Sequence, residues 1–152
     1  MPTQKLQDYL DQHEIQYVTI SHSPAYTAQR IAELTRIPGK ELAKTVIVKV
    51  DDKLAMAVLP ASRRVNLQHL QEAIGADEVT LSSETEFNEL FPDCEVGAMP
   101  PFGNLYDMGV YVAEQLTEDD EIAFNAGSHS ELVKMSYNDY AKLVTPQVVS
   151  LT

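Results

Sequence analysis

Hydrophobic and polar residues follow two different periods along this chain, and these periods divide it into helices and strands. The segment TQKLQDYLDQHE spaces its apolar residues along one face of a helix, for which Thr3 is a suitable N-terminal cap. By contrast, KTVIVKV (44–50) and KLAMAVLP (53–60) are β-rich runs joined by Asp51-Asp52, which predicts a hairpin. Their nearly continuous apolar character predicts a central pair of strands covered on both faces.

The same periods assign the remaining elements of the chain. Further helices are predicted at 27–37, 66–75, 83–91 and 136–144, and further strands at 15–21, 78–82, 109–116, 121–127, 130–136 and 147–151. The second helix is expected to start at a Thr27 cap and to stop at Pro38-Gly39, and Ser83 with Glu86 forms a capping-box pattern. Because helices and hairpins interleave, the predicted fold class is α/β, a single domain with a mixed β-sheet and surrounding helices over residues 1–152.

Composition is consistent with one ordinary globular domain. The chain has 152 residues, of which 44% are hydrophobic and 22% are charged. It contains no apolar run of the roughly 18 residues that cross a bilayer, and the opening MPTQKLQDYLDQ is too polar for a signal peptide. The single cysteine, Cys94, cannot form an internal disulfide. We therefore expect a cytoplasmic protein with no membrane partner.

The charge is unevenly distributed. The net charge of −12 argues against broad affinity for DNA or other nucleic acid, since phosphate binding relies on Lys and Arg. Residues 30–64 nevertheless hold eight of the eleven basic residues and four acids, a net +4, whereas the remainder carries three basic and nineteen acidic residues, a net −16. This segment is either a solvated surface whose charges cluster or a local binding site for a phosphorylated ligand.

The common catalytic arrangements are absent from the sequence. Cys94 with His129 could form a Cys/His pair, but the neighbouring Asp93 and Glu95 disfavour the reactive thiolate. The four histidines are widely separated and form no metal-binding pattern, and neither a G-x-S-x-G elbow nor a P-loop is present. We therefore expect neither a metal nor a cofactor.

Two polar features on predicted strands could carry chemistry. Lys44 opens the first hairpin strand, and such a lysine is most often only solvated, although an ammonium at a pocket edge can clamp a phosphate or a carbonyl oxygen. In FNAGSHSE, Gly127 ends a strand and a polar trio follows. That trio is either a plain turn or a means of placing His129 beside a substrate.

The segment DCEVGAMPPFGN (93–104) predicts a stiff loop. Pro100 and Pro101 fix φ and lack N–H groups, while Gly97 and Gly103 permit positive φ or a close backbone approach. Such a loop could recognise a small ligand with its backbone or serve as an ordered crossover, and residue chemistry alone leaves both open.

Five segments together resemble the YbaK family of aminoacyl-tRNA deacylases, which is related to the editing domain inserted in bacterial prolyl-tRNA synthetases. In chain order they are HSPAYTAQRIAEL, AKTVIVKV, AVLPASRRVNLQHL, GAMPPFG and AGSHSELVKMSYNDY. They span nearly the whole chain. The resemblance implies a trans-editing hydrolase that cleaves the ester between a wrongly attached amino acid and the terminal ribose of a tRNA.

The resemblance also implies site residues. It makes Lys44, Gly97 and His129 the catalytic set, with Lys44 near the ribose–phosphate end of the substrate and the loop from Gly97 shaping the amino-acid pocket. The residues implied to bind substrate are His22, Thr27, Ala98, Met99, Pro100, Pro101, Gly103, Gly127 and Ser128. We expect Arg63 and Arg64 to contact tRNA. Many relatives carry a Gly-Gly pair where this chain has one glycine followed by alanine, so the amino acid removed stays open.

The chemistry of an aminoacyl ester suits a chain without a strong nucleophile. Such an ester is already activated, so a positioned water and oxyanion stabilisation can be enough. Two other functions stay open. One is a non-catalytic module that binds a small molecule, an aminoacyl analogue or a synthetase, and the other is an ester hydrolase using Cys94 and His129.

Overall fold

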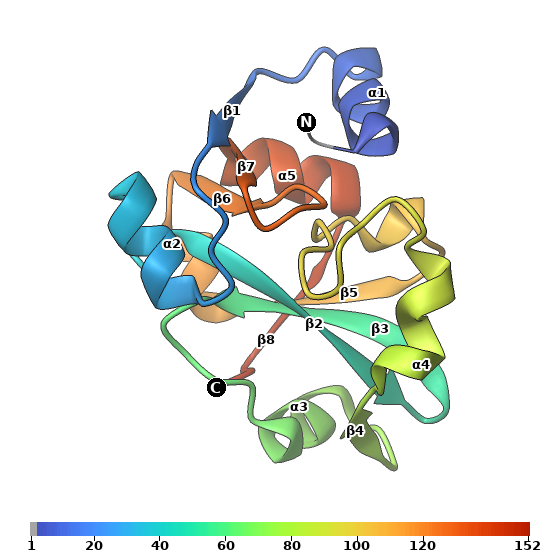
Figure 1. The fold of residues 1–152 in the computed structure, drawn as a ribbon. Coiled ribbons are helices and arrows are strands. Elements are labelled where there is room, and N and C mark those ends of the chain that lie inside the picture. The colour runs from blue at the N-terminus through green and yellow to red at the C-terminus, as the bar shows by residue number, and fades with distance from the viewer. Residues whose placement is uncertain (1–2) are drawn as a thin grey trace.

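The computed structural model describes residues 3–152, which form one eight-stranded mixed sheet with helices packed around it (Figure 1). The strands are β1 (Tyr17–Ser21), β2 (Leu42–Val50), β3 (Lys53–Pro60), β4 (Val79–Leu81), β5 (Gly109–Ala113), β6 (Glu121–Asn125), β7 (Glu131–Ser136) and β8 (Gln147–Val149). The α-helices are α1 (Gln4–Gln12), α2 (Ala28–Thr35), α3 (Leu67–Ile74), α4 (Glu84–Phe87) and α5 (Tyr137–Val144). The strand order is β1-β7-β6-β2-β3-β5-β8, with β4 paired to β2 outside this path. The predicted α/β class is confirmed.

The β2–β3 hairpin is the centre of the sheet, as its sequence predicts. Asp51 and Asp52 have φ of 46° and 70°, the left-handed values of a tight two-residue hairpin turn. The Asp51 carboxylate also accepts hydrogen bonds from the backbone N–H groups of Asp77 and Glu78, at 3.0 and 2.8 Å. Residues 56–59 are completely buried, which confirms that both faces of this pair are covered.

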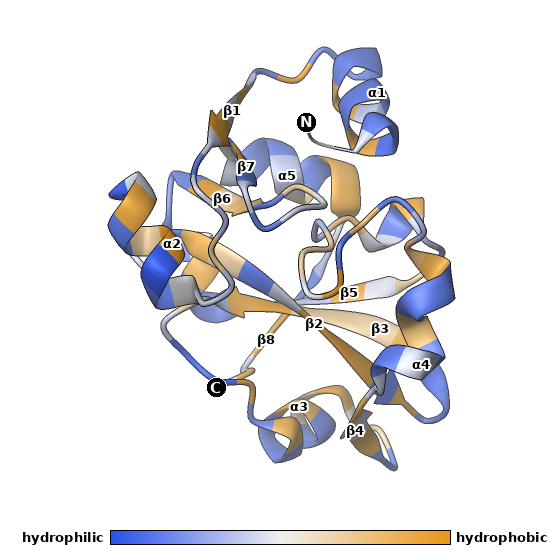
Figure 2. Ribbon diagram, viewed as in Figure 1, coloured by the Kyte–Doolittle hydropathy of each residue, from blue (hydrophilic) through white to orange (hydrophobic). Residues whose placement is uncertain are grey.

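Helices cover the two faces of the sheet separately (Figure 1). On one face, α1, α5 and the loop before β5 enclose the larger core, with Phe102, Phe124 and Tyr140 at its centre. On the other, α3 and β8 bury a smaller apolar cluster that includes Leu70 and Val149. Figure 2 shows the hydrophobic residues concentrated in β2 and β3, whereas the helices alternate between hydrophobic and hydrophilic residues.

Helix starts follow the capping signals in the sequence. The side chains of Thr3, Thr27, Asn66 and Ser136 each accept a backbone N–H from the first turn, at 3.0 to 3.3 Å. The capping box at the start of α4 is also present. No helix among the described residues is both long and apolar enough to cross a membrane.

Several predicted strands are one or two residues shorter in the structure, and three boundary differences have a clear local cause. Helix α2 ends before the Pro-Gly pair, because Arg36 adopts a left-handed φ of 60° while its N–H bonds to the carbonyl of Ala32. The helix predicted at 83–91 is α-helical for only one turn and continues as a 3-10 helix, η1 (Asn88–Leu90). The strand predicted at 109–116 ends at Ala113, where another 3-10 helix, η3 (Glu114–Glu118), begins.

Candidate functional site

A gap in strand pairing opens one edge of β2. This strand pairs with β3 along its length, but on the opposite edge β6 pairs only with Leu42 and Ala43, and β4 only with residues 48–50. Residues 44–47, which we call the β2 gap, therefore have no strand partner on that edge within the described chain. Continuing the parallel β2–β6 register by one position would set Lys44 opposite Asn125.

A small cavity of about 180 Å³ lies at the β2 gap. It is lined by Tyr26, Ile31, Leu42, Ala43, Lys44, Thr45, Ala61, Gly97, Asn125 and His129. The structure thus brings together Lys44, Gly97 and His129, the three residues implied to carry catalysis, from three distant segments. The volume is below the roughly 300–1,000 Å³ typical of pockets for drug-sized ligands, so the cavity suits a group about the size of a small amino acid.

Lys44 places an ammonium at this cavity without a local counter-charge. Its side chain is half-buried, and among residues 3–152 it makes no hydrogen bond or ion pair. Burial lowers the pKa of Lys44 below its ordinary value, and the positive charge of Arg64 lowers it further. The ammonium is therefore available to a substrate oxygen.

Four hydrogen bonds hold the start of the proline loop against the turn that carries His129. The Glu95 N–H donates to Gly127 O at 2.7 Å, and the Gly127 N–H donates to Ala98 O at 2.8 Å. The His129 N–H donates to Glu95 Oε2 at 3.2 Å, and its ring Nε2 lies 2.8 Å from Val96 O. These contacts fix the Gly97 backbone and the His129 ring relative to each other.

Glycine is required on both sides of this contact. Gly97 and Gly127 have φ of +85° and +104°, which L side chains rarely adopt. A methyl group on Gly97 would lie 3.6 Å from His129 Cε1, so the missing side chain leaves the cavity open beside that ring. At Gly127, a Cβ would collide with the side chain of Thr3.

The double proline lies in the core and does not line the cavity. Pro100 and Pro101 are buried, and Pro101 O accepts a hydrogen bond of 2.7 Å from the Tyr140 hydroxyl. A Cβ on Gly103 would approach the backbone oxygen of Met108 to 2.6 Å, so this glycine permits close packing. Ala98, Met99, Pro100, Pro101 and Gly103, all implied to bind substrate, are buried and absent from the cavity lining. Their observed role is to anchor the loop that presents Gly97.

The other residues implied to bind substrate do not line the cavity but lie on the segments that carry lining residues. Thr27 caps α2, and the His22 N–H donates to Ser130 O at 2.8 Å. The Ser128 hydroxyl lies 3.3 Å from that of Ser130, within the turn that positions His129. Between His22 and Thr27, an exposed Tyr26 does line the cavity, and its ring centroid lies 4.7 Å from that of His129.

Cys94 is not a nucleophile in this site. It does not line the cavity, and its sulfur lies 3.8 Å from both the Tyr106 hydroxyl and Asp93 Oδ1. Burial, reinforced by the Asp93 charge, raises the pKa of the thiol to about 11. The thiol is therefore protonated at neutral pH. Within the described residues, no group of three or more His, Cys, Asp or Glu side chains is placed to hold a metal ion.

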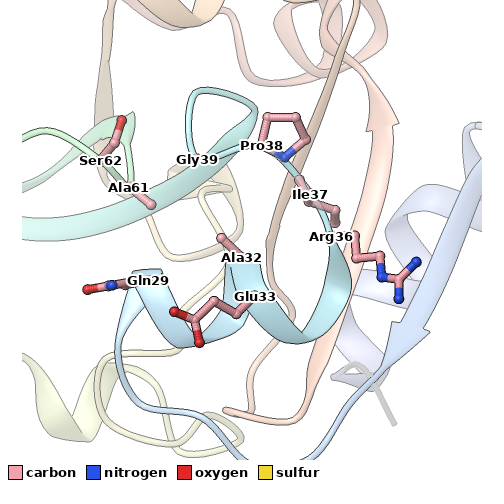
Figure 3. Close-up of a pocket in the computed structure, with 9 residues that line it drawn as sticks. All are labelled: Gln29, Ala32, Glu33, Arg36, Ile37, Pro38, Gly39, Ala61 and Ser62. Carbon is pink, nitrogen blue, oxygen red and sulfur yellow. The ribbon is translucent and has the colours of Figure 1, made fainter.

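A larger open groove of about 720 Å³ adjoins the cavity through Ala61, which lines both (Figure 3). Its walls are α2 with the following loop on one side, and Ala61 with Ser62 on the other. The lining residues are Gln29, Ala32, Glu33, Arg36, Ile37, Pro38, Gly39, Ala61 and Ser62. Nearly all of them belong to the basic segment 30–64, and the charged residues among them are Glu33 and Arg36.

The fold and the cavity define a class of protein: a mixed α/β domain with a small lysine-bearing pocket at a gap in its sheet. The model of the aminoacyl-tRNA editing domain matches residues 22–143, and the chain belongs to this family. The predicted resemblance to editing deacylases is confirmed.

Relatives with curated names agree with this assignment. The chain is 29% identical over 153 residues to the multifunctional Ser/Thr-tRNA deacylase ProXp-y of Escherichia coli, covering 97% of this chain and 90% of that protein. It is also 29% identical over 82 residues to a proline–tRNA ligase of Bacillus cereus, covering 54% of this chain but only 14% of the ligase.

Solved structures share the fold at lower identity. The crystal structure of a hypothetical protein superposes with a TM-score of 0.87 at 21% identity, covering 97% of this chain and 99% of the other. A structure described as a candidate trans-editing enzyme for prolyl tRNA synthetase gives a TM-score of 0.82 at 18% identity, covering 97% and 94%.

Several cavity residues escaped the sequence analysis. Tyr26, Thr45 and Asn125 are polar and line the cavity, but none was singled out. Thr45 directly follows the selected lysine, and Asn125 precedes the selected Ala-Gly-Ser-His turn. Their positions beside those motifs were the available signal, while their convergence depends on the β2 gap, which is a property of strand pairing.

Proposed function

We propose that the chain is a trans-editing hydrolase that removes a wrongly attached amino acid from the acceptor end of a tRNA. The observation that carries the proposal is the convergence of Lys44, Gly97 and His129 on one small cavity in a chain of the editing family. The cavity suits an aminoacyl group and leaves the nucleotide outside. Because the Escherichia coli relative is named a Ser/Thr-tRNA deacylase, seryl and threonyl esters are the first substrates to test.

The reaction needs only water as nucleophile. Water oxygen adds to the ester carbonyl carbon, and the tetrahedral intermediate then releases the ribose oxygen, which takes up the proton. The products are a free amino acid and a tRNA with its terminal hydroxyls restored. The Lys44 ammonium would provide positive charge beside the developing oxyanion or the adjoining ribose, and the hydrogen-bonded loop at Gly97 would hold the ester in place.

The tRNA would approach over the basic segment. Arg63 and Arg64 are exposed and follow β3, and Arg64 is close enough to influence the pKa of Lys44. The open groove beyond Ala61 offers a path for nucleotides next to the terminal adenosine (Figure 3). With few basic residues, binding should be modest and sensitive to salt. We propose that the protein works in the cytoplasm, where tRNA is charged, and a synthetase is a further candidate partner.

A panel of mischarged tRNAs tests this function directly. We expect deacylation of at least one aminoacyl-tRNA, loss of that activity in Lys44→Ala, and full activity in Lys142→Ala, an exposed lysine on α5 that serves as the control. Unchanged cleavage in Lys44→Ala would refute the mechanism. If the protein cleaves no member of the panel but is thermally stabilised by an aminoacyl analogue, it is a binding module instead.

A further inference from the structure

An exposed aromatic ring lies at the mouth of the cavity. Tyr26 lines the cavity, yet 74% of its surface is exposed, more than for any other exposed large hydrophobic residue among residues 3–152. The others are aliphatic, namely Val18, Leu81, Leu90, Val96 and Val148. The Tyr26 hydroxyl makes no hydrogen bond within the described chain. The ring is therefore open to a ligand that reaches the mouth of the cavity.

The backbone on both sides of Tyr26 is fixed. The Ala25 N–H donates to His129 O at 3.0 Å, and the Thr27 side chain caps α2 by a hydrogen bond. The Tyr26 ring packs against the ring of His129, with centroids 4.7 Å apart and planes inclined by 48°. Hydrogen bonds to the proline loop hold His129 in turn. His129 thus supports one side of the Tyr26 ring, and the high exposure leaves the rest of it in solvent.

We infer that the adenine base of the terminal nucleotide stacks on the open side of Tyr26, an inference that rests on the proposed function. The cavity of about 180 Å³ holds the aminoacyl group and leaves the ribose at its mouth, and the base is joined directly to this ribose. Every base has a flat π-face that stacks on aromatic side chains without a hydrogen-bond partner. The stack thereby favours an ester carried by a nucleoside over the same ester without a base.

Stacking also supplies affinity that charge provides poorly in this chain. At a net charge of −12, the protein repels polyanions over most of its surface, and only segment 30–64 is positive. Tyr26 shortly precedes that segment, and no acidic residue is among those that line the cavity. Because stacking releases no counterions, it adds binding without requiring further Lys or Arg residues.

Two esters that differ only in the base test the stack. Both carry the amino acid that the mischarged-tRNA panel shows to be removed, one on the ribose of adenosine and the other on 1-O-methylribose. We expect the wild type to cleave the adenosine ester with a kcat/KM at least fivefold higher, because stacking of one base is worth about fivefold to a hundredfold. Tyr26→Ala should lose this preference, and Tyr26→Phe should keep it. Leu81→Ala, at an exposed position of β4 away from the cavity lining, is the matched control that should change neither rate.

A second readout needs no catalysis. The chain contains no tryptophan, so Tyr26→Trp introduces a single indole whose fluorescence reports on its surroundings. We expect quenching when an uncharged RNA minihelix ending in CCA is added, and no quenching with the same minihelix lacking the terminal base. Because Tyr26 is exposed, all three of its variants should melt close to the wild-type temperature.

The outcomes separate stacking from the other roles of the ring. Equal kcat/KM for the two esters in the wild type, or unquenched fluorescence with the complete minihelix, overturns the stack while leaving the deacylase intact. An equal loss on both esters in Tyr26→Ala also overturns it, because the ring would then act by positioning His129. If no mischarged tRNA of the panel is cleaved, the proposed function itself is refuted, and the stack with it.

Discussion

Replacing Gly97 with alanine should lower both the stability of the protein and its deacylation rate, for two different reasons. At a φ of +85°, any L residue is strained, and the cost of left-handed backbone is about 1–2 kcal/mol. For a chain of this length that corresponds to a fall in Tm of about 2–8 °C. The added methyl group would also lie 3.6 Å from His129 Cε1, at the wall of a cavity of only about 180 Å³. Displacing the ester by about 1 Å can cost two orders of magnitude in rate, so we expect a loss of deacylation of at least tenfold.

Gly75 provides a matched control for the backbone strain. It ends α3 with a φ of +69°, and a Cβ built there meets nothing within 4 Å. Gly75→Ala should therefore lose a similar amount of stability while keeping the wild-type rate of deacylation. Only the methyl group beside His129 distinguishes the two variants in function.

The assay combines thermal unfolding with single-turnover deacylation of a mischarged tRNA, measured well below both melting temperatures. We expect similar losses of Tm in the two variants and a loss of rate in Gly97→Ala alone. A rate for Gly97→Ala within twofold of wild type, at an equal loss of Tm, would refute the placement of the ester beside Gly97.

Three further variants test the charges and the thiol. With a small aminoacyl ester as substrate, activity should be lost at a higher alkaline pH in Arg64→Gln than in the wild type. Removing the neighbouring positive charge raises the lowered pKa of Lys44, so its side chain stays protonated to higher pH. Loss of activity at the same pH as in the wild type, or at a lower pH, would contradict this. Arg63→Glu should weaken tRNA binding and reduce its salt dependence while sparing the small ester, and equal losses on both substrates would argue against a tRNA contact. Cys94→Ala should keep full activity, and alkylation of Cys94 should accelerate only as pH approaches about 11; rapid alkylation at neutral pH would contradict the raised pKa.

The secondary structure could be predicted well because its signals are local. Caps at Thr3, Asn66 and Ser136, and the Asp-Asp turn, each depend on residues within one turn of the chain. The boundary errors arose where the backbone rather than the side chain decides. Arg36 ends α2 with a left-handed φ, a conformation that cannot be predicted from an arginine side chain.

The site was harder to predict than the secondary structure, because it forms where strands from distant parts of the chain pair. Lys44 and His129 could be selected from their motifs, and the structure places them at one cavity. The burial of the prolines could not be predicted, since a stiff loop is equally suited to a pocket wall or to a core. Tyr140, on a helix far along the chain, holds Pro101 in the core by a hydrogen bond to its carbonyl oxygen. Asn125 precedes the selected Ala-Gly-Ser-His turn, but its place at the cavity follows only from the register of β6 against β2.

Buried polar side-chain atoms that lack a hydrogen-bond partner are concentrated where we place the substrate. Within residues 3–152, five buried side-chain atoms lack a partner, and three of them belong to residues that line the cavity, namely Thr45, Asn125 and His129. Away from the cavity, side chains cap the starts of helices α1, α2, α3 and α5 by hydrogen bonds, and the central strands β2 and β3 are covered on both faces. An unpaired buried polar atom is unfavourable, and folded proteins contain few of them. It follows that Thr45→Val, which removes one unpartnered hydroxyl without changing shape, should raise the Tm of the empty protein, and an unchanged or lower Tm would contradict this.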